Sequence, residues 1–409
     1  MHSIFRIFIT LSTRIMMRYF LGCCLLLFIS TSALFCQQTN QALLDSREVP
    51  FEMVKNAIIV PVKINGISYR FVLDTGGVFM ISRKLQEQGN FVVTDSISIS
   101  DINKQEQVFE KVLIEEASIG ELSLKDREAI VLFDNQSYPN SCFETDGMIG
   151  RDFFGGMILQ FDYDNKVIRL TEDESVFDLD QEHRTKMKIS ERGIADVLLN
   201  INGKNQYIEF DSGSGDFFSY QAKKAKRLRV KSKADKLEYE GIFSFGVSSS
   251  NLIESSTRYK AKVYNLTMGS TTFENFYSDF TKPTAPRIGA SILYHGKVTV
   301  DYKNLWFYFE PYPTQFKPTT LSTFGFDIVY LQEQYLIKWV LKGSVAEQEG
   351  LKFGLKIKSI DGTPIAEIIK GCETYINGYA FQEKESVVLE YYDPKGTLKT
   401  MTLHKTQYE

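Results

Sequence analysis

The chain has 409 residues, of which 43% are apolar, 13% aromatic and 24% charged, a composition typical of a globular protein rather than a disordered, collagen-like or multispanning membrane protein. The formal net charge of -4 provides no basic surface for binding nucleic acid. Because only four His and five Cys are present, chemistry that depends on zinc clusters, histidine bases or a disulfide framework is disfavoured.

The N-terminal segment has the pattern of a secretory signal peptide. Arg18 precedes an uncharged stretch, Tyr19 to Cys36, whose apolar part of about ten residues ends in small residues. A membrane anchor needs about twenty apolar residues. We therefore expect residues 1–36 to be a signal peptide and the protein to be exported to the periplasm or envelope of a bacterium, with secretion as the next choice. Membrane association would run only through an uncleaved leader or a lipidated Cys36.

An internal repeat follows the leader. Residues 58–82 and 195–219 each contain an alternating strand, the turn Ile-Asn-Gly and a second strand that ends at Asp-Thr-Gly or Asp-Ser-Gly. The turn glycine precedes the aspartate by eight residues in both copies. The identical spacing indicates a duplicated unit.

A second pair of matched segments extends the repeat. Residues 146–170 and 286–309 each place a glycine 12 residues before an aspartate. We predict two lobes of one catalytic unit, residues 37–178 and 179–315, joined by an acidic linker near residues 171–182.

The repeated aspartates, Asp74 and Asp211, suggest a chemistry. One Asp-Ser/Thr-Gly tripeptide is a weak signal, because the same residues form ordinary turns. Two lobes related by an approximate two-fold axis would place the aspartates face to face. Two carboxyls within about 3 Å cannot both ionise, so they share one proton. The ionised carboxyl can then accept a proton from water while the protonated one donates to a carbonyl oxygen. This hydrolysis of an amide needs no metal, cofactor or histidine.

At these residues the sequence resembles the aspartic protease superfamily, in its retropepsin-like bacterial form with two lobes in one chain. The second family signature, an apolar pair before glycine, matches residues 148–150 and, less well, residues 287–289. The resemblance implies an all-β dominated, bilobal pepsin/retropepsin-like acid protease β-barrel fold and flap hairpins near residues 98–110 and 240–254. It implies catalytic roles for Asp74 and Asp211. It also implies that the hydroxyls of Thr75 and Ser212 cross-bond the two loops and that Gly76 and Gly213 permit tight turns. Arg287 replaces an apolar residue, and we expect this to affect the packing behind the second loop rather than the aspartates.

A third segment begins after the proline-bearing stretch 311–318. We expect strands near 325–330 and 335–341, one or two helical turns within 343–350, a helix within 364–376 and a hairpin from 387 to 403. Residues 320–409 resemble a PDZ domain, a β-sandwich or barrel with one or two short helices. Three residues are similar to its carboxylate-binding loop, whose backbone N–H groups bind a peptide terminus: Phe324, Gly325 and Phe326. The alternative is a module that only caps the protease.

The sequence leaves two functions open. The first is an exported aspartic-type endopeptidase that cleaves peptide or protein substrates, with a PDZ domain that binds peptide or protein termini. The second is a catalytically silent lobe pair whose PDZ domain binds the C-termini of envelope proteins. The basic cluster at residues 223–231 is typical of a solvated face rather than a nucleic-acid site, and the absence of a Gly-x-Ser-x-Gly motif and of metal-ligand spacing disfavours serine hydrolases and metalloproteases.

Overall fold

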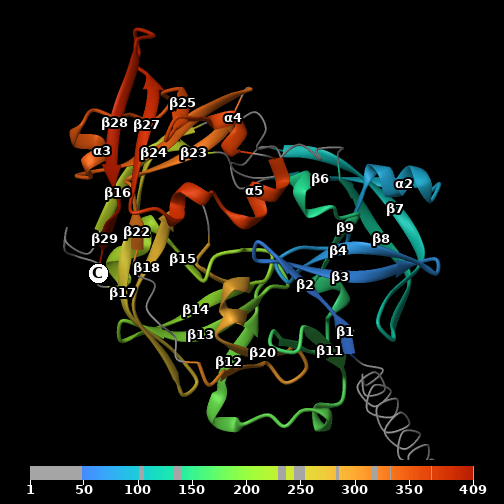
Figure 1. Cartoon of the computed structure of the whole chain (residues 1–409). Helices are drawn as coiled ribbons and strands as arrows, with labels where there is room; N and C mark the ends of the chain where they lie inside the picture. Colours follow the sequence, from blue (N-terminus) through green and yellow to red (C-terminus); the bar gives the residue numbers. More distant parts are fainter. Residues whose placement is uncertain are drawn as a thin grey trace, which may run out of the picture. The chain divides into compact units, whose positions relative to one another are not determined.

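Strands dominate the described chain, as the alternating apolar patterns predict. The computed structural model (Figure 1) describes residues 48–100, 106–132, 140–228, 236–243, 254–281, 285–314, 321–331, 333–369 and 371–408. The predicted signal peptide lies outside these residues. The fold is all-β dominated with short helices, which confirms the prediction of a strand-dominated fold. Within the described ranges, no helix combines the length and apolarity needed to span a membrane.

The first repeat forms an eight-stranded sheet with the order β2-β3-β4-β9-β5-β8-β7-β6. Buried and exposed side chains alternate along residues 60–64 of β3, so one face of this part of the strand packs in the core. Its elements are β2 (Glu52–Val54), β3 (Ala57–Ile64), β4 (Ile67–Asp74), β5 (Met80–Ser82), α2 (Arg83–Gln88), β6 (Val93–Ser100), β7 (Glu106–Ile119), β8 (Leu122–Leu132), η1 (Asn140–Phe143), β9 (Gly147–Gly150) and η2 (Arg151–Phe153).

The second repeat follows the same plan. Strand β14 pairs in parallel with β19 as β4 does with β9, and β15 pairs in parallel with β18 as β5 does with β8. The duplicated sequence therefore builds duplicated strand pairings. Its elements are β12 (Arg184–Ile189), β13 (Ala195–Ile201), β14 (Lys204–Asp211), β15 (Phe218–Gln221), η5 (Ala222–Leu228), β16 (Lys236–Phe243), β17 (Glu254–Met268), β18 (Thr271–Thr281), β19 (Arg287–Gly289) and η6 (Ala290–Tyr294).

The Ile-Asn-Gly turns connect equivalent hairpins. Asn65 and Gly66 have φ values of 48° and 82°, and Asn202 and Gly203 have 49° and 77°. A two-residue turn with positive φ at both positions matches the right-handed twist of the flanking strands. These turns therefore fix the register of the hairpins whose second strands end at the aspartates.

The two repeats meet along strands β10 (Ile158–Asp162) and β20 (Gly296–Asp301), which pair antiparallel. Strands β11 (Val167–Thr171) and β21 (Trp306–Pro311) flank them, and β1 (Glu48–Pro50) lies outside β11. By the repeat spacing, residues 159, 160 and 161 correspond to 298, 299 and 300. The observed pairs are Leu159 with Val300, Gln160 with Thr299 and Phe161 with Val298. This register is unchanged when the repeats are exchanged, so an approximate two-fold axis passes between Gln160 and Thr299, whose side chains are hydrogen-bonded at 3.0 Å.

One hydrophobic core extends through both repeats. Phe161 of the first repeat packs against Phe210 of the second with ring centroids 6.1 Å apart, and Phe307 contacts Phe210 at 5.2 Å. All three side chains are fully buried. Because Phe210 immediately precedes Asp211, the packing of these rings fixes the end of the strand that carries the second aspartate.

The C-terminal residues form a module with its own core, which includes Ile337, Leu389 and Leu403. Its strands and helices lie near the predicted positions. They are β22 (Leu321–Thr323), β23 (Phe326–Leu331), β24 (Gln334–Leu341), α3 (Val345–Gln348), β25 (Ile357–Ile360), β26 (Thr363–Pro364), α4 (Ile365–Ile368), α5 (Gly371–Asn377), η7 (Ala380–Glu383), β27 (Ser386–Tyr392), β28 (Leu398–His404) and β29 (Thr406–Tyr408).

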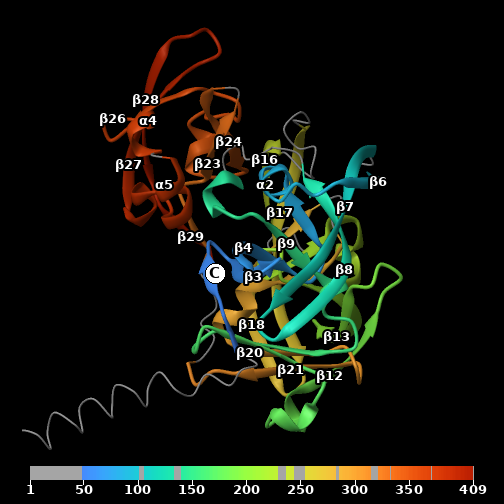
Figure 2. The ribbon, with the colours of Figure 1, turned by 90° about the vertical axis from the view of Figure 1, so that its right-hand side faces the viewer.

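Strand β24 of this module joins the sheet of the second repeat. It pairs antiparallel with β16, the first strand of the β16–β17 hairpin, and Figure 2 shows the two strands side by side. A Cβ atom at Gly241 would lie 2.4 Å from the Cβ of Trp339. Glycine at this position therefore permits the close approach of the two strands.

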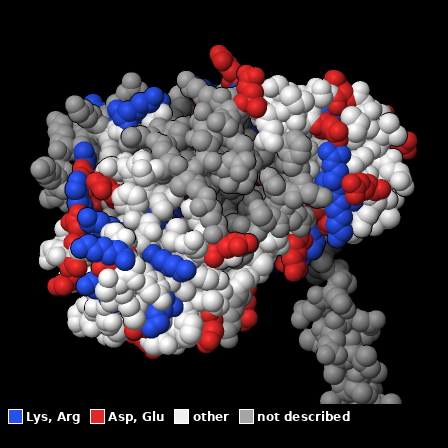
Figure 3. All heavy atoms as spheres, turned by 90° about the horizontal axis from the view of Figure 1, so that it is seen from above, with Lys and Arg blue, Asp and Glu red and all other residues white. Residues whose placement is uncertain are grey.

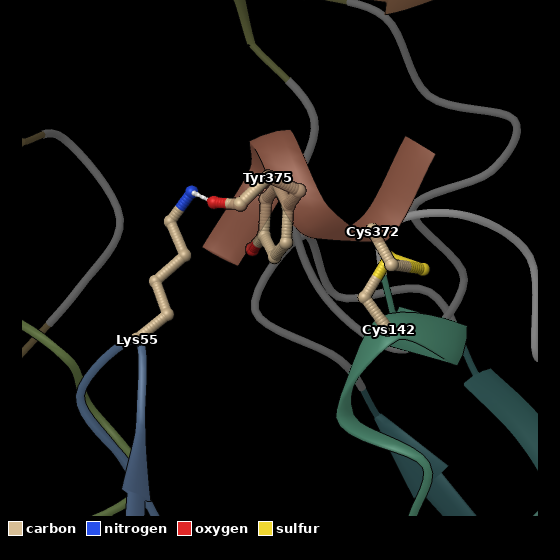
Figure 4. Close-up of a disulfide and its surroundings, with 4 residues drawn as sticks. All are labelled: Lys55, Cys142, Cys372 and Tyr375. Carbon is tan, nitrogen blue, oxygen red and sulfur yellow. Dashed lines mark hydrogen bonds between the residues drawn. A yellow bond between two sulfur atoms is a disulfide. The ribbon is translucent and has the colours of Figure 1, made fainter. Parts of the chain in front are cut away.

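A disulfide joins the same module to the first repeat. Cys142 in η1 bonds to Cys372 in α5, with their Cα atoms 4.8 Å apart (Figure 4). Beside it, the Lys55 ammonium donates to the carbonyl of Tyr375 and lies 3.5 Å from the centroid of its ring. The distance between these cysteines in the sequence did not indicate a pair. The module thus contacts both repeats.

Loss of this disulfide should destabilise the folded chain by about 2–5 kcal/mol, because the bond closes a long loop between cysteines 230 residues apart. Urea unfolding of residues 37–409, followed with and without a phosphine reductant, measures the effect. The Cys142→Ser/Cys372→Ser variant should match the reduced wild type and should not respond to reductant. Equal unfolding midpoints for oxidised and reduced wild type would contradict the prediction.

Charged side chains on the described surface are mixed in sign. On the face shown in Figure 3, acidic and basic residues lie among one another. Several form exposed ion pairs, such as Arg70 with Glu52 at 2.8 Å. Exposed pairs of this kind contribute little to stability, so packing and strand pairing hold the fold together.

Candidate active site

The two aspartates end equivalent strands. Asp74 is the last residue of β4 and lies opposite Gly150, and Asp211 ends β14 opposite Gly289. A Cβ atom at Gly150 would lie 2.3 Å from the backbone of Gly77, and one at Gly289 would lie 2.3 Å from backbone carbonyl oxygens of the second loop. Only glycine lets the crossing strand approach each loop this closely, which explains the glycine of the second signature.

Thr75 and Ser212 join the two aspartate loops. The Thr75 N–H donates to Ser212 Oγ at 2.9 Å, and the Ser212 N–H donates to Thr75 Oγ1 at 3.0 Å. Each hydroxyl then donates across the interface, Thr75 to the carbonyl of Phe210 at 3.1 Å and Ser212 to that of Leu73 at 2.9 Å. Both side chains are fully buried. The structure thus brings the two loops together through four reciprocal hydrogen bonds.

The carboxyl groups of Asp74 and Asp211 face each other and are joined by a side-chain hydrogen bond. The inner oxygen Oδ1 of Asp74 accepts from the N–H groups of Gly76 and Gly77 at 2.8 and 3.0 Å, and Oδ1 of Asp211 accepts from Gly213 at 3.1 Å. A Cβ at Gly76 would lie 2.8 Å from Asp211 Oδ1, and a Cβ at Gly213 would lie 2.2 Å from Asp74 Cγ. The two glycines therefore make room for the carboxyl of the opposite repeat.

This environment changes the acidity of Asp74. Burial, the charge of Asp211 and the hydrogen bond that protonated Asp74 donates to Asp211, in that order, raise the pKa of Asp74 from 3.8 to about 7, while the N–H groups of Gly76 and Gly77 act in the opposite direction. Because two adjacent carboxyls titrate as one unit, the pair holds a proton in mildly acidic solution.

Two arginines contact the aspartate loops in different ways. Arg151 in η2 donates to the carbonyl oxygens of Gly76 and Gly77 at 2.6 and 2.7 Å. Arg287 donates directly to Asp211 Oδ2 at 2.6 Å. The expectation that Arg287 would affect only the packing behind the second loop is therefore wrong, because its long side chain reaches the carboxyl. Sequence reasoning missed Arg151, although it follows the signature glycine where the second repeat has Ala290.

The predicted flap regions coincide with two equivalent hairpins, β6–β7 and β16–β17. The stems of both hairpins are formed by long antiparallel ladders. Their tips, residues 101–105 and 244–253, lie outside the described residues. Among the described residues, no group of three or more His, Cys, Asp or Glu side chains is arranged to hold a metal ion.

The aromatic rings of the predicted peptide-binding loop pack inside the C-terminal module. Phe324 and Phe326 are buried, and each ring lies 6.3 Å from that of Phe381. The N–H of Gly325 donates to Thr323 Oγ1 at 3.1 Å. The two phenylalanine side chains therefore belong to the core of the module, and only the loop backbone is left to contact a ligand.

A groove lies beside this loop, between β23 and the segment that includes α5. It encloses about 420 Å³. Strand β23 is the outermost strand of its sheet, so its outer edge faces no further strand of that sheet. The first repeat also contributes to this groove through Lys55. The other residues that line it include Asp327, Tyr330, Lys338, Tyr375 and Tyr379.

Comparison with known proteins gives a partial match. Residues 60–153 match the model of a family described as aspartyl protease, a range that contains the first Asp-Thr-Gly and Met148-Ile149-Gly150. No curated protein matched the chain. Among solved structures, the chain is similar to the aspartic proteinase from Irpex lacteus, with 12% identity and a TM-score of 0.37 over 65% of this chain and 97% of that chain. The family match supports protease chemistry.

Proposed function

We propose that the protein is an exported aspartic-type endopeptidase whose reaction uses a water molecule activated by Asp74 and Asp211. The observation that carries this proposal is the hydrogen-bonded pair of carboxyls between two cross-bonded, equivalent loops. The raised pKa of Asp74 supports it, since a pair that holds one proton contains both an acid and a base.

The reaction follows from that single shared proton. The ionised carboxyl accepts a proton from water as the water oxygen bonds to the carbonyl carbon, and the protonated carboxyl donates to the carbonyl oxygen. A tetrahedral diol results, and the carboxyl that was ionised is now protonated while the other is ionised. The C–N bond then breaks as the amide nitrogen accepts a proton from one carboxyl, while a diol hydroxyl returns a proton to the other. The products are a carboxylic acid and an amine, and the pair regains its starting state.

The C-terminal module has a separate proposed role as a PDZ domain that binds peptide or protein termini. The outer edge of β23 and the adjoining groove support this role, because an extended peptide can add to a free sheet edge. The buried Phe324 and Phe326 restrict direct recognition by the loop to its backbone.

Cleavage of an unfolded polypeptide tests the protease proposal. Residues 37–409, without reductant, should cleave a carboxymethylated protein in mildly acidic solution. Activity should fall as pH rises through about 7, because Asp74, with its pKa raised to about 7, then loses the proton that the reaction requires. A hydroxyl-containing peptidomimetic that mimics the tetrahedral diol should inhibit cleavage and raise the melting temperature. If neither cleavage nor stabilisation occurs at any pH and C-terminal peptides still bind, the silent scaffold is the correct function.

A further inference from the structure

We propose that Arg287 is a positioning residue that keeps Asp211 ionised, so that Asp211 is the base toward water and Asp74 carries the shared proton. This inference rests on the proposed function of the same carboxyl pair. It assigns different roles to two residues that the repeat makes equivalent.

The contact between Arg287 and Asp211 is close and shielded. Arg287 begins β19, and its Nη1 lies 2.6 Å from Asp211 Oδ2, with side-chain exposures of 22% and 12%. Its Nε also donates to the carbonyl of Ala285 at 3.4 Å. A charge-assisted hydrogen bond in a partly desolvated site is stronger than the same pair in water. The ionised form of Asp211 is the form that this bond favours.

At the position equivalent to Arg287, the first repeat has a methionine instead of a cation. By strand register, Arg287 lies opposite Glu209 in β14, and Met148 lies opposite Val72 in β4, so Met148 is the counterpart of Arg287. The nearby Arg151 donates to backbone carbonyls of the loop and not to Asp74. The two carboxyls are thus related by the fold but differ in their charge environment, which removes the symmetry of proton sharing.

Other charged groups near Arg287 leave this pairing intact. Glu209, on the strand beside it, is paired with Arg192. Asp216 interacts electrostatically with Arg287, Lys260 and Asp279, and its burial, followed by the charge of Asp279, raises its pKa. A raised pKa favours the neutral form of Asp216, which competes less with Asp211 for Arg287. Lys260 is itself held by Asp279 at 2.7 Å.

The consequence is a wider active range on the acid side. The pair is inactive when both carboxyls are protonated, and a cation beside Asp211 delays that second protonation to lower pH. An opposite charge within hydrogen-bonding distance moves a carboxyl titration by about 1–3 pH units. Removal of the Arg287 charge should therefore move the acid limb of the kcat/KM profile to higher pH by about one unit or more, and the alkaline limb by less.

A titration that does not depend on turnover tests the assignment directly. In wild-type protein labelled with carbon-13 at aspartate Cγ, the Asp211 resonance should titrate at lower pH than the Asp74 resonance, with the two signals assigned from the Asp74→Asn and Asp211→Asn variants. If Asp74 ionises first, the inference is overturned even if the protein is an active protease. If the order holds but no cleavage occurs, the inference survives and the proposed function fails.

Three variants complete the test. Arg287→Met, which copies the first repeat, should move the Asp211 titration and the acid limb upward. Arg287→Lys should restore most of both, because it returns the charge. Arg70→Met removes an arginine whose partner is the exposed Glu52 and should leave both unchanged. An Arg287→Met protein that folds with an unaltered Asp211 titration would refute the role, and if that variant does not fold, Arg287→Lys and the wild-type titration order decide.

Discussion

Asparagine at position 74 or 211 should reduce kcat/KM for peptide cleavage by about 10³-fold or more, because each substitution removes one partner of an acid–base pair. The substitution is nearly isosteric, and the amide oxygen can still accept the N–H groups that now contact Oδ1, those of Gly76 and Gly77 for position 74. The folded structure should therefore persist. Initial rates across pH 3–8, together with melting curves, measure both effects.

An exposed aspartate provides the control for this prediction. Asp164 lies in the turn between β10 and β11, and Asp164→Asn should leave the rate unchanged. Activity within tenfold of wild type in either dyad variant would remove Asp74 and Asp211 from the reaction. Loss of activity with an equal loss of the melting transition would instead report unfolding, and the melting curves separate the two.

Alanine at position 213 should also abolish most activity, by displacing a carboxyl without removing it. The added Cβ would lie 2.2 Å from Asp74 Cγ and 2.3 Å from its Oδ2, so the Asp74 carboxyl has to move. A displacement of about 1 Å in a reacting group can cost about 10²-fold in rate. We expect kcat/KM to fall by about that factor, and the substrate or inhibitor affinity to fall less.

Gly155→Ala is a matched control, because a Cβ there would meet no atom within 4 Å. It adds the same methyl group to another loop and should have wild-type kinetics. A Gly213→Ala enzyme with full activity would mean that the two loops separate easily, in contrast to the reciprocal hydrogen bonds of Thr75 and Ser212. A crystal structure of that variant would show the displaced carboxyl.

Much of the core of the site could be predicted from the sequence because it depends on local rules used twice. Asn-Gly turns fix the hairpin registers, and equal spacing then delivers Asp74 and Asp211 to equivalent positions. The glycines at 150 and 289 follow from close backbone approach. These features need only backbone geometry and a two-fold relation, which periodicity and repeat spacing encode.

The remaining features depend on contacts between segments that no local rule connects. The reach of Arg287 to Asp211 is set by a long side chain, and its position in the motif suggested only altered packing. Cys142 and Cys372 are adjacent only after the C-terminal module has docked. The orientation of Phe324 and Phe326 likewise follows from the packing of Phe381, which lies in a distant part of the module sequence.

The pairing of β16 with β24 has a consequence for how this chain can be divided. Without residues 321–408, β16 would become an edge strand, with its N–H and C=O groups along Tyr239 to Gly241 deprived of the partners they now have. Unprotected edges recruit strands from other molecules. By pairing with β16, the C-terminal module therefore also prevents this strand from pairing with another molecule. A shortened protein that contains only the two repeats would expose an unpaired edge strand in the hairpin expected to cover its substrate, and we expect it to self-associate.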